Sequence, residues 1–185
     1  MELEGLIPRE STALVVVDIQ EKLYPHINGK EKVLANAVKV IDFCRRLEIP
    51  IVVTEQYPKG LGVTLPEVKE ALGEDYRPIP KTAFSCFGEP EFTAAVADLE
   101  VDTLVIIGIE THVCIAQTAL VGAASDYDIL VLADCVGARS EFNHNAGLGR
   151  LRDEAVLVGS AEMFFYEMLV EAKTEDHQAV FDLLK

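Results

Sequence analysis

The sequence lacks the features that would place a chain in a membrane. No stretch reaches the roughly 20 consecutive apolar residues that a membrane-spanning helix needs, although half of all residues are apolar. The segment Met1–Gly5 is acidic and has neither the basic region nor the apolar run of a signal peptide. We therefore expect no contact with a membrane.

Basic residues are also scarce. The chain has 16 Lys and Arg against 31 Asp and Glu, which gives a formal net charge of −15. Nucleic acids and anionic membrane surfaces are bound by clustered Lys and Arg. The charge therefore argues against nucleic acid as a partner, and we interpret the acidity as a contribution to solubility.

Paired cysteines and paired histidines are missing. No C-x-x-C pair occurs, and the pattern fits neither a disulfide framework nor a zinc ribbon. The four cysteines stand far apart at Cys44, Cys86, Cys114 and Cys135. The four histidines, none at the spacing of zinc ligands, are His26, His112, His144 and His177. A reducing, cytoplasmic setting is the expectation.

What the sequence does contain is a regular alternation of strand and helix patterns. Apolar runs predict strands at 12–17, 49–54, 76–80, 103–108, 129–133 and 155–158. Helical periodicity predicts helices at 30–47, 89–99, 112–125, 141–153, 163–171 and 174–184. The segment 57–66 is rich in Pro and Gly and is predicted to be an irregular loop. Apolar strands separated by helices indicate an α/β fold over residues 1–185, a single three-layer α/β/α sandwich with a mainly parallel, Rossmann-like sheet.

In parallel sheets of this kind, ligands bind outside the carboxyl ends of the strands. Five residues with suitable chemistry follow predicted strands, and they are Asp18, Glu55, Lys81, Cys114 and Asp134. They come from distant parts of the chain, so the topology alone is expected to bring their neighbourhoods together.

Cys114 has the most informative position of the five. It comes just after the apolar run 103–109, and Thr111 stands where a helix N-cap is expected. The thiol should therefore lie in the first turn of a helix, where unpaired backbone N–H groups and the helix dipole favour a thiolate. The same N–H groups are suited to receive an oxyanion.

Asp18 and Lys81 would complete a nucleophilic site. A thiol needs a base to take its proton, a leaving group needs an acid, and a cation stabilises both anions. Taken singly, Asp18 fits a turn cap equally well, and Lys81 fits an ordinary surface lysine. The three together make chemical sense as base and acid, cation and nucleophile.

The chain resembles the isochorismatase-like cysteine hydrolases, which include nicotinamidases. The similar segments are Val17–Gln20, Lys81–Phe84, Gly108–Cys114, Ala133–Cys135 and Ser160–Met163. Three further segments resemble the branch of isochorismatase domain-containing proteins, namely Asp18–Lys22, Glu55–Gly62 and Gly108–Glu110. The resemblance runs in order from about Thr12 to Leu169.

This resemblance implies Cys114 as the nucleophile, Asp18 as the general base and acid, and Lys81 as the third member of the triad. It also implies a non-proline cis peptide between Ile109 and Glu110. The N–H groups of Glu110 and Cys114 would then bind the oxyanion.

The departures from the family narrow the expected chemistry. Nicotinamidases carry metal-binding histidines after the second strand, but the corresponding segment here, Thr54–Pro58, contains none. True isochorismatases lack the cysteine. We therefore predict a hydrolase of a small amide or ureido substrate, acting through a thioester without metal or organic cofactor.

The walls of the pocket are expected to come from residues near strand ends, namely Gln20, Tyr24, Glu55, Phe84 and Ile109. Phe84 fits core packing equally well. An unpaired Glu55 near an apolar pocket would have a raised pKa or would bind a cationic group.

Other interpretations stay open. A catalytically idle protein of the same fold could serve as a binding partner, and a thiol redox role would need Cys86 or Cys135 as the resolving residue. Flavodoxin-like or receiver modules would leave Cys114 unexplained. The apolar helix after Cys114 and the segment Met163–Val170 favour a homo-oligomer, either a dimer or a tetramer.

Overall fold

Six strands form one sheet in the order β3-β2-β1-β4-β5-β6, and every adjacent pair is parallel. The structure is a computed structural model and describes residues 5–184, so residues 1–4 and 185 of the predicted domain lie outside the described part. The strands are β1 (Thr12–Val17), β2 (Ile51–Gln56), β3 (Ile79–Lys81), β4 (Thr103–Ile109), β5 (Asp128–Gly137) and β6 (Leu157–Gly159).

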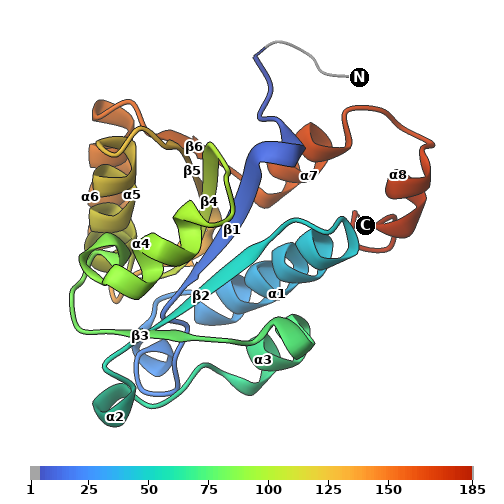
Figure 1. The fold of residues 1–185 in the computed structure, drawn as a ribbon. Helices are drawn as coiled ribbons and strands as arrows, with labels where there is room; N and C mark the ends of the chain where they lie inside the picture. The colour runs from blue at the N-terminus through green and yellow to red at the C-terminus, as the bar shows by residue number, and fades with distance from the viewer. Residues whose placement is uncertain (1–4, 185) are drawn as a thin grey trace.

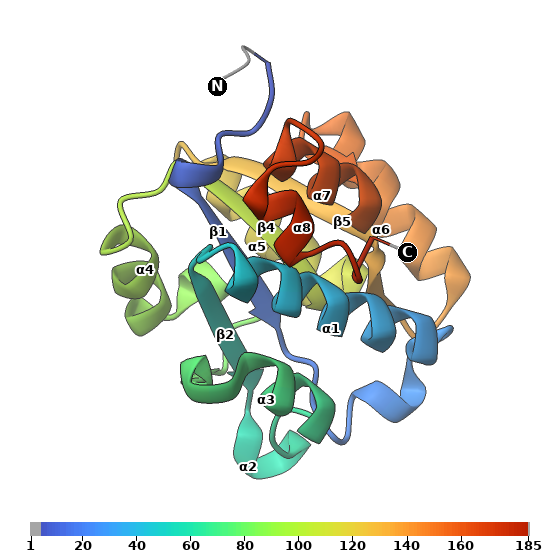
Figure 2. The same cartoon turned by 90° about the vertical axis from the view of Figure 1, so that its right-hand side faces the viewer.

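Helices cover both faces of this sheet (Figure 1). One layer contains α4 (Pro90–Ala97), α5 (Ala116–Ala123) and α6 (Glu141–Asp153). The other contains α1 (Lys30–Arg46), α3 (Pro66–Leu72) and α7 (Ala161–Leu169), with α8 (Glu175–Ala179) beside them, as Figure 2 shows. The predicted three-layer α/β/α sandwich is confirmed. No helix in the described range is long and apolar enough to cross a membrane.

The apolar strand pattern follows from burial on both sides. In β1, Leu14 and Val16 pack into the core under α1, whereas Val15 and Val17 pack into the core under α5. All six residues of β1 are buried. The sequence of this strand is therefore continuously apolar instead of alternating.

The segment 57–66 is more regular than predicted. Its first part forms the short helix α2 (Pro58–Leu61), and Pro66 begins α3, which periodicity did not reveal. Proline is favourable in the first turn of a helix because its missing N–H has no partner there anyway. Pro58 and Pro66, which favoured a loop in the sequence, are instead the first residues of α2 and α3.

The central strands β1 and β4 lie side by side but lead to opposite faces of the sheet. The chain after β1 continues to α1, and the chain after β4 continues to α5 on the other face (Figure 1). Such a switch point leaves a crevice at the carboxyl ends of the two strands. Asp18 follows β1, and the helical turn that contains Cys114 follows β4.

Gly108 allows β4 to approach β1 closely at this point. Its φ is +121°, and a Cβ atom built there would lie 2.0 Å from the carbonyl oxygen of Val17. Any side chain would push apart the strands that carry Asp18 and Cys114. The glycine is therefore a geometric requirement of the crevice.

Substituting Gly108→Ala is expected to lower the free energy of unfolding by at least about 3 kcal/mol, because backbone atoms must move to relieve the clash and the conformation is strained. Urea unfolding measures the change. The matched control is Gly149→Ala in α6, where no atom lies within 4 Å of the added Cβ. That variant should be unchanged or stabilised by up to about 1 kcal/mol. Equal stabilities for the two variants would show that β1 and β4 do not require a glycine at position 108.

Candidate active site

Three elements bring Asp18, Lys81 and Cys114 together. Asp18 directly follows β1 in the left-handed region, with φ at 53°, and is fully buried. Lys81 is the last residue of β3. Cys114 lies in a π-helical turn, η5 (Thr111–Ile115), between β4 and α5. π-Helical turns are uncommon and are frequently found at functional sites.

Lys81 and Asp18 form an ion pair with no solvent exposure on either side chain. The Lys81 Nζ atom lies 2.7 Å from Asp18 Oδ2. It also donates hydrogen bonds of 2.6 Å to Gln56 Oε1, 3.2 Å to the carbonyl oxygen of Ala83 and 3.1 Å to that of Phe84. The three protons of the charged ammonium group meet the last three of these acceptors, and its positive charge lies against Asp18 Oδ2. Lys81 is thus held as a fixed cation.

The two charges affect each other's titration. Burial raises the pKa of Asp18 above its ordinary value of 3.8, and this outweighs the attraction of Lys81 and the hydrogen bond from Thr54. Burial lowers the pKa of Lys81, but attraction to Asp18 and to the sulfurs of Cys114 and Cys86 leaves it raised overall. Asp18 is therefore a stronger base than an exposed aspartate, and Lys81 stays protonated.

The thiol of Cys114 is not pre-ionised, which corrects the expectation of a low pKa. Burial and then the negative charge of Asp18 raise the pKa of Cys114 to about 12, although Lys81 acts in the opposite direction. The Cys114 thiol therefore keeps its proton at neutral pH.

The start of the helix also differs from the prediction. The N-cap residue is Glu110, without a side-chain capping bond, and the Thr111 hydroxyl lies 3.0 Å from His144 Nδ1 instead. The carbonyl oxygen of Glu110 accepts hydrogen bonds from the N–H groups of Val113 and Ile115. The peptide bond between Ile109 and Glu110 is cis, as the family resemblance implied.

The carboxylate of Glu110 has a structural partner. Its Oε2 accepts hydrogen bonds from the backbone N–H and the Nε of Arg139, at 3.1 and 3.0 Å. This interaction ties the turn after β4 to the segment after β5. One of the two carboxylate oxygens of Glu110 is therefore held by Arg139.

Two of the predicted pocket residues are occupied by internal hydrogen bonds. Gln20 donates to the carbonyl oxygens of Gln56 and Gly62 and accepts from the N–H of Gln56. Glu55 Oε1 accepts from the N–H and hydroxyl of Thr64 and from the Tyr76 hydroxyl, at 2.7 to 2.8 Å. With these donors Glu55 needs no cationic partner. Both residues shape the site by fixing the segment that contains α2.

The other three predicted pocket residues differ from one another. Ile109 is 1% exposed and packs with Ile27, and Tyr24 is half-buried against this small cluster. Phe84 is 54% exposed, so it is not a core residue, and its carbonyl oxygen contacts Lys81. Of the three, Phe84 is the exposed apolar side chain beside the triad.

Three further residues around the triad were not predicted from the sequence. Thr54 donates to Asp18 Oδ1 at 2.8 Å, Gln56 accepts from Lys81, and the Cys86 sulfur lies 3.8 Å from the Thr54 hydroxyl oxygen. Because strand residues alternate in direction, Thr54 and Gln56 share one side of β2. The available signal was the run of three polar residues, Thr54 to Gln56, that ends an otherwise apolar strand.

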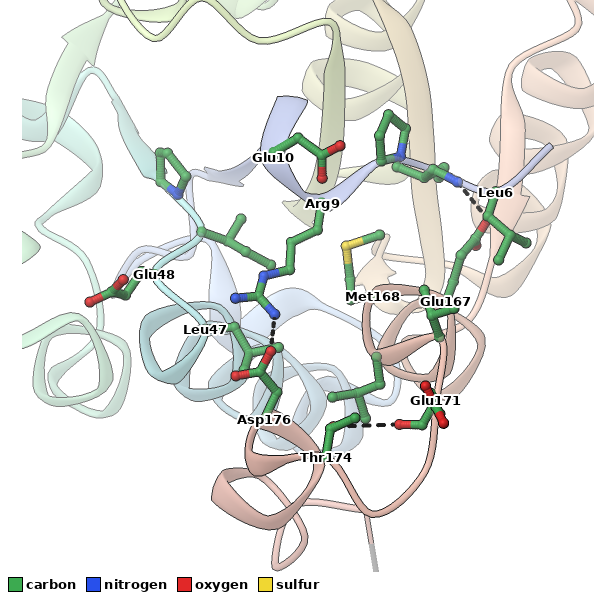
Figure 3. Close-up of a pocket in the computed structure, with 16 residues that line it drawn as sticks. Leu6, Arg9, Glu10, Leu47, Glu48, Glu167, Met168, Glu171, Thr174 and Asp176 are labelled. Carbon is green, nitrogen blue, oxygen red and sulfur yellow. Dashed lines mark hydrogen bonds and ion pairs between the residues drawn. The ribbon is translucent and has the colours of Figure 1, made fainter. Parts of the chain in front are cut away.

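Two cavities lie outside the triad. One of about 860 Å³ is at the opposite, amino-terminal edge of the sheet, where the Arg9–Asp176 ion pair spans it (Figure 3). A second of about 220 Å³ lies between the end of β5 and the start of α1. Neither is lined by a triad residue. Among the described residues, no group of three or more His, Cys, Asp or Glu side chains is arranged to hold a metal ion.

Comparisons with known proteins agree with this architecture. The family model of the isochorismatase domain matches residues 12–163. Isochorismatase domain-containing protein 2 from Danio rerio is 32% identical over 180 residues, which cover 97% of this chain and 90% of that protein.

Solved structures show the same fold. A MAR1 ribonuclease from Caenorhabditis elegans has a TM-score of 0.91 and 29% identity, covering 97% of this chain and 92% of that one. The YcaC gene product of Escherichia coli, described as an octameric hydrolase of unknown specificity, has a TM-score of 0.90. It is 20% identical and covers 99% of this chain and 91% of that chain, so it supports the fold alone.

Removing the cation should destabilise the protein in a pH-dependent manner. Lys81→Met leaves a buried carboxylate unpaired, which costs about 3–5 kcal/mol where Asp18 is ionised. Without Lys81 the folded-state pKa of Asp18 is raised further, so protonation relieves the cost at low pH, and the loss grows as pH rises through that pKa. Urea unfolding at about pH 5 and about pH 8 measures this trend.

Exposed Lys32 supplies the control for this prediction. Lys32→Met should change stability by no more than about 0.5 kcal/mol at either pH. A Lys81→Met loss that is the same at both pH values would contradict a titrating Asp18.

Alkylation by iodoacetamide should report the proton shared between Cys114 and Asp18. Cys114 is 6% exposed, whereas Cys44, Cys86 and Cys135 are fully buried, so a single adduct is expected by mass spectrometry. The rate should stay level from neutral pH down to the raised pKa of Asp18 and fall below it. In Asp18→Asn the level region should disappear, and the alkylation rate should fall about tenfold for each unit by which the pH is lowered. Identical profiles for the two proteins would show that Asp18 is not the base.

Proposed function

Because this chain belongs to the isochorismatase family, we propose that it is a cysteine hydrolase that cleaves a small amide or ureido C–N bond. Cys114 is the nucleophile, Asp18 is the general base and acid, and Lys81 is the fixed cation beside them. The observation that carries this proposal is the fully buried Asp18–Lys81 ion pair, whose charges both act on the Cys114 thiol.

The first half of the reaction forms a thioester. Asp18 takes the thiol proton as the sulfur of Cys114 attacks the carbonyl carbon, and the carbonyl oxygen becomes an oxyanion. The N–H groups of Glu110 and Cys114 bind this oxyanion. When the C–N bond breaks, Asp18 returns the proton to the nitrogen, and ammonia or an amine leaves. Lys81 keeps its proton throughout and stabilises the negative charge shared by sulfur and carboxylate.

The second half hydrolyses the thioester. Asp18 is again ionised and takes a proton from a water molecule, whose oxygen attacks the thioester carbonyl. The C–S bond then breaks, the sulfur of Cys114 recovers the proton from Asp18, and the acid is released. One amide and one water give one acid and one amine, and the enzyme returns to its starting state.

We propose that this chemistry uses no metal or organic cofactor. In nicotinamidases the segment after the second strand supplies metal-binding histidines, whereas here that segment serves the triad. Thr54 binds Asp18 and Gln56 binds Lys81. Glu55 is tied to Thr64 and Tyr76. The side chains at that place therefore already have partners in this chain.

Two other functions are less well supported. The 29%-identical neighbour described as a ribonuclease suggests RNA, but a net charge of −15 disfavours a polyanionic substrate. A purely binding protein would have no need of an ion pair removed from water, because burying two charges costs free energy. Cys114 next to that pair favours catalysis.

A homo-oligomer also forms part of the proposal, and the predicted segment Met163–Val170 supports it better than the helix after Cys114 does. The apolar helix after Cys114 is largely covered within the chain, since Ala116, Ala119 and Gly122 of α5 are buried. On α5 the exposed large apolar side chain is Val121, whereas β6 and α7 expose Leu157, Met163 and Tyr166. An apolar surface of this kind is suited to a second copy of the chain. A cytoplasmic location stays a prediction.

A screen of small amides and ureides for ammonia release tests the function. With a substrate that the protein hydrolyses, Cys114→Ala should reduce kcat/KM by at least about 10³-fold, because the nucleophile that forms the thioester is lost. Mass spectrometry of the wild-type protein should detect the acyl adduct on Cys114.

Cys135→Ala is the matched control, since this buried thiol lies in the core on the α1 side of the sheet. It should keep activity within a few-fold of wild type at about 25 °C. Turnover that survives the loss of Cys114 would rule out the thioester route.

A further inference from the structure

The triad has a buried partner in Thr54, the fourth residue of β2. Thr54 pairs with Val17 in the sheet, so it lies directly beside Asp18. Its hydroxyl donates a 2.8 Å hydrogen bond to Asp18 Oδ1, and its carbonyl oxygen accepts a 3.2 Å hydrogen bond from the Asp18 N–H. Thr54 is fully buried. The aspartate is therefore held by one residue at both its backbone and its carboxylate.

The two carboxylate oxygens of Asp18 have different surroundings. Oδ1 accepts a hydrogen bond from the Thr54 hydroxyl. Oδ2 lies 2.7 Å from Lys81 Nζ, yet no donor among the described residues meets it with hydrogen-bond geometry, because Lys81 directs its protons to Gln56 and two carbonyl oxygens. Oδ2 thus has the stabilising charge beside it and a lone pair free for a proton.

Cys86 fixes the direction of the Thr54 hydroxyl. Its sulfur lies 3.8 Å from Thr54 Oγ1, and its backbone N–H donates to the Thr118 hydroxyl of α5 at 3.0 Å. Burial, followed by the charge of Asp18, raises the pKa of Cys86 to about 11, so it keeps its proton at neutral pH. A thiol proton given to Thr54 Oγ1 leaves the single hydroxyl proton for Asp18, and hydrogen bonds in such a chain strengthen one another.

From this arrangement we propose that Thr54, backed by Cys86, is a positioning residue that binds Asp18 Oδ1 and so assigns all proton exchange with Cys114 and the leaving group to Oδ2. The proposal rests on the proposed cysteine hydrolase function and adds a residue that selects the working oxygen of its base. Thr54 itself exchanges no proton with the substrate.

The sign of the expected effect follows from the groups around Asp18. Lys81 of β3 is a cation throughout, and the thiols of Cys86 and Cys114 titrate only at high pH, so Asp18 alone changes charge in the acidic range. The Thr54 hydrogen bond favours the ionised carboxylate and lowers its pKa. Removing that hydroxyl must therefore raise the pKa of Asp18.

The experiment measures the iodoacetamide alkylation rate of Cys114 against pH, a readout that needs no substrate. Thr54→Val removes the hydroxyl and nearly conserves the shape. It should move the acidic midpoint of the profile up by about one pH unit, the size expected for a hydrogen bond to a charged group. Thr54→Ser keeps the hydroxyl and should return the midpoint to within about 0.3 pH unit of wild type.

Two further variants separate positioning from packing. Thr12→Val removes another fully buried hydroxyl, which bonds to the Pro8 carbonyl oxygen at the far end of β1, and should leave the midpoint unchanged. Cys86→Ala should move it in the same direction as Thr54→Val but by less, because the hydroxyl remains. If valine prevents folding, Thr54→Ala repeats the test with a smaller side chain that has neither the hydroxyl nor a γ-methyl group.

The outcomes distinguish this inference from the proposed function. If wild type has an acidic midpoint that Asp18→Asn abolishes, and folded Thr54→Val has the same midpoint as wild type, the role of Thr54 is wrong while the base remains. If wild type has no such midpoint, the proposed base is wrong and the inference is overturned with it. A raised midpoint in Thr54→Val that serine restores supports the positioning role.

Discussion

The ion pair between Asp18 and Lys81 is the interaction on which the site depends. Both side chains are removed from water, and such a pair is costly unless its geometry and further hydrogen bonds compensate. The compensation here comes from three oxygen acceptors around Lys81 and a hydroxyl donor on Asp18. Because the cation is locked, the carboxylate is the group that is free to gain and lose a proton. With its pKa raised to about 12, Cys114 is a thiol beside this pair and not a pre-formed thiolate.

The fold supplies the positions for this chemistry. A parallel sheet with the order β3-β2-β1-β4-β5-β6 places its switch point between β1 and β4, and Gly108 lets these strands meet without a side chain between them. Asp18 and Cys114 then face each other from the ends of adjacent strands. Lys81 reaches them from β3, two strands away, with a long side chain that is fully buried.

Much of the fold can be predicted from the sequence, and the reason is physical. Burial on both faces gives continuous apolar strands, and the apolar run 12–17 has the same bounds as β1 in the structure. Helical periodicity likewise predicts α6 with the bounds 141–153 that the structure has. The hydrogen-bond partners are harder to predict. Gln20 and Glu55 resemble pocket residues because both follow predicted strands, although Glu55 lies within β2 in the structure. Their partners lie in a segment whose short helices periodicity does not reveal. The raised pKa of Cys114 depends on burial and on the distance to Asp18, which are properties of the folded chain.

The most direct test of proton transfer from Cys114 to Asp18 is a carbon NMR titration of the Asp18 carboxylate in the unmodified protein. We predict a midpoint above the ordinary value of 3.8, because burial outweighs the attraction of Lys81 and the donated hydrogen bonds. A midpoint at or below 3.8 would contradict this mechanism. Asp18 would then be an ordinary stabilised anion beside Lys81, and too weak a base to take the proton of Cys114.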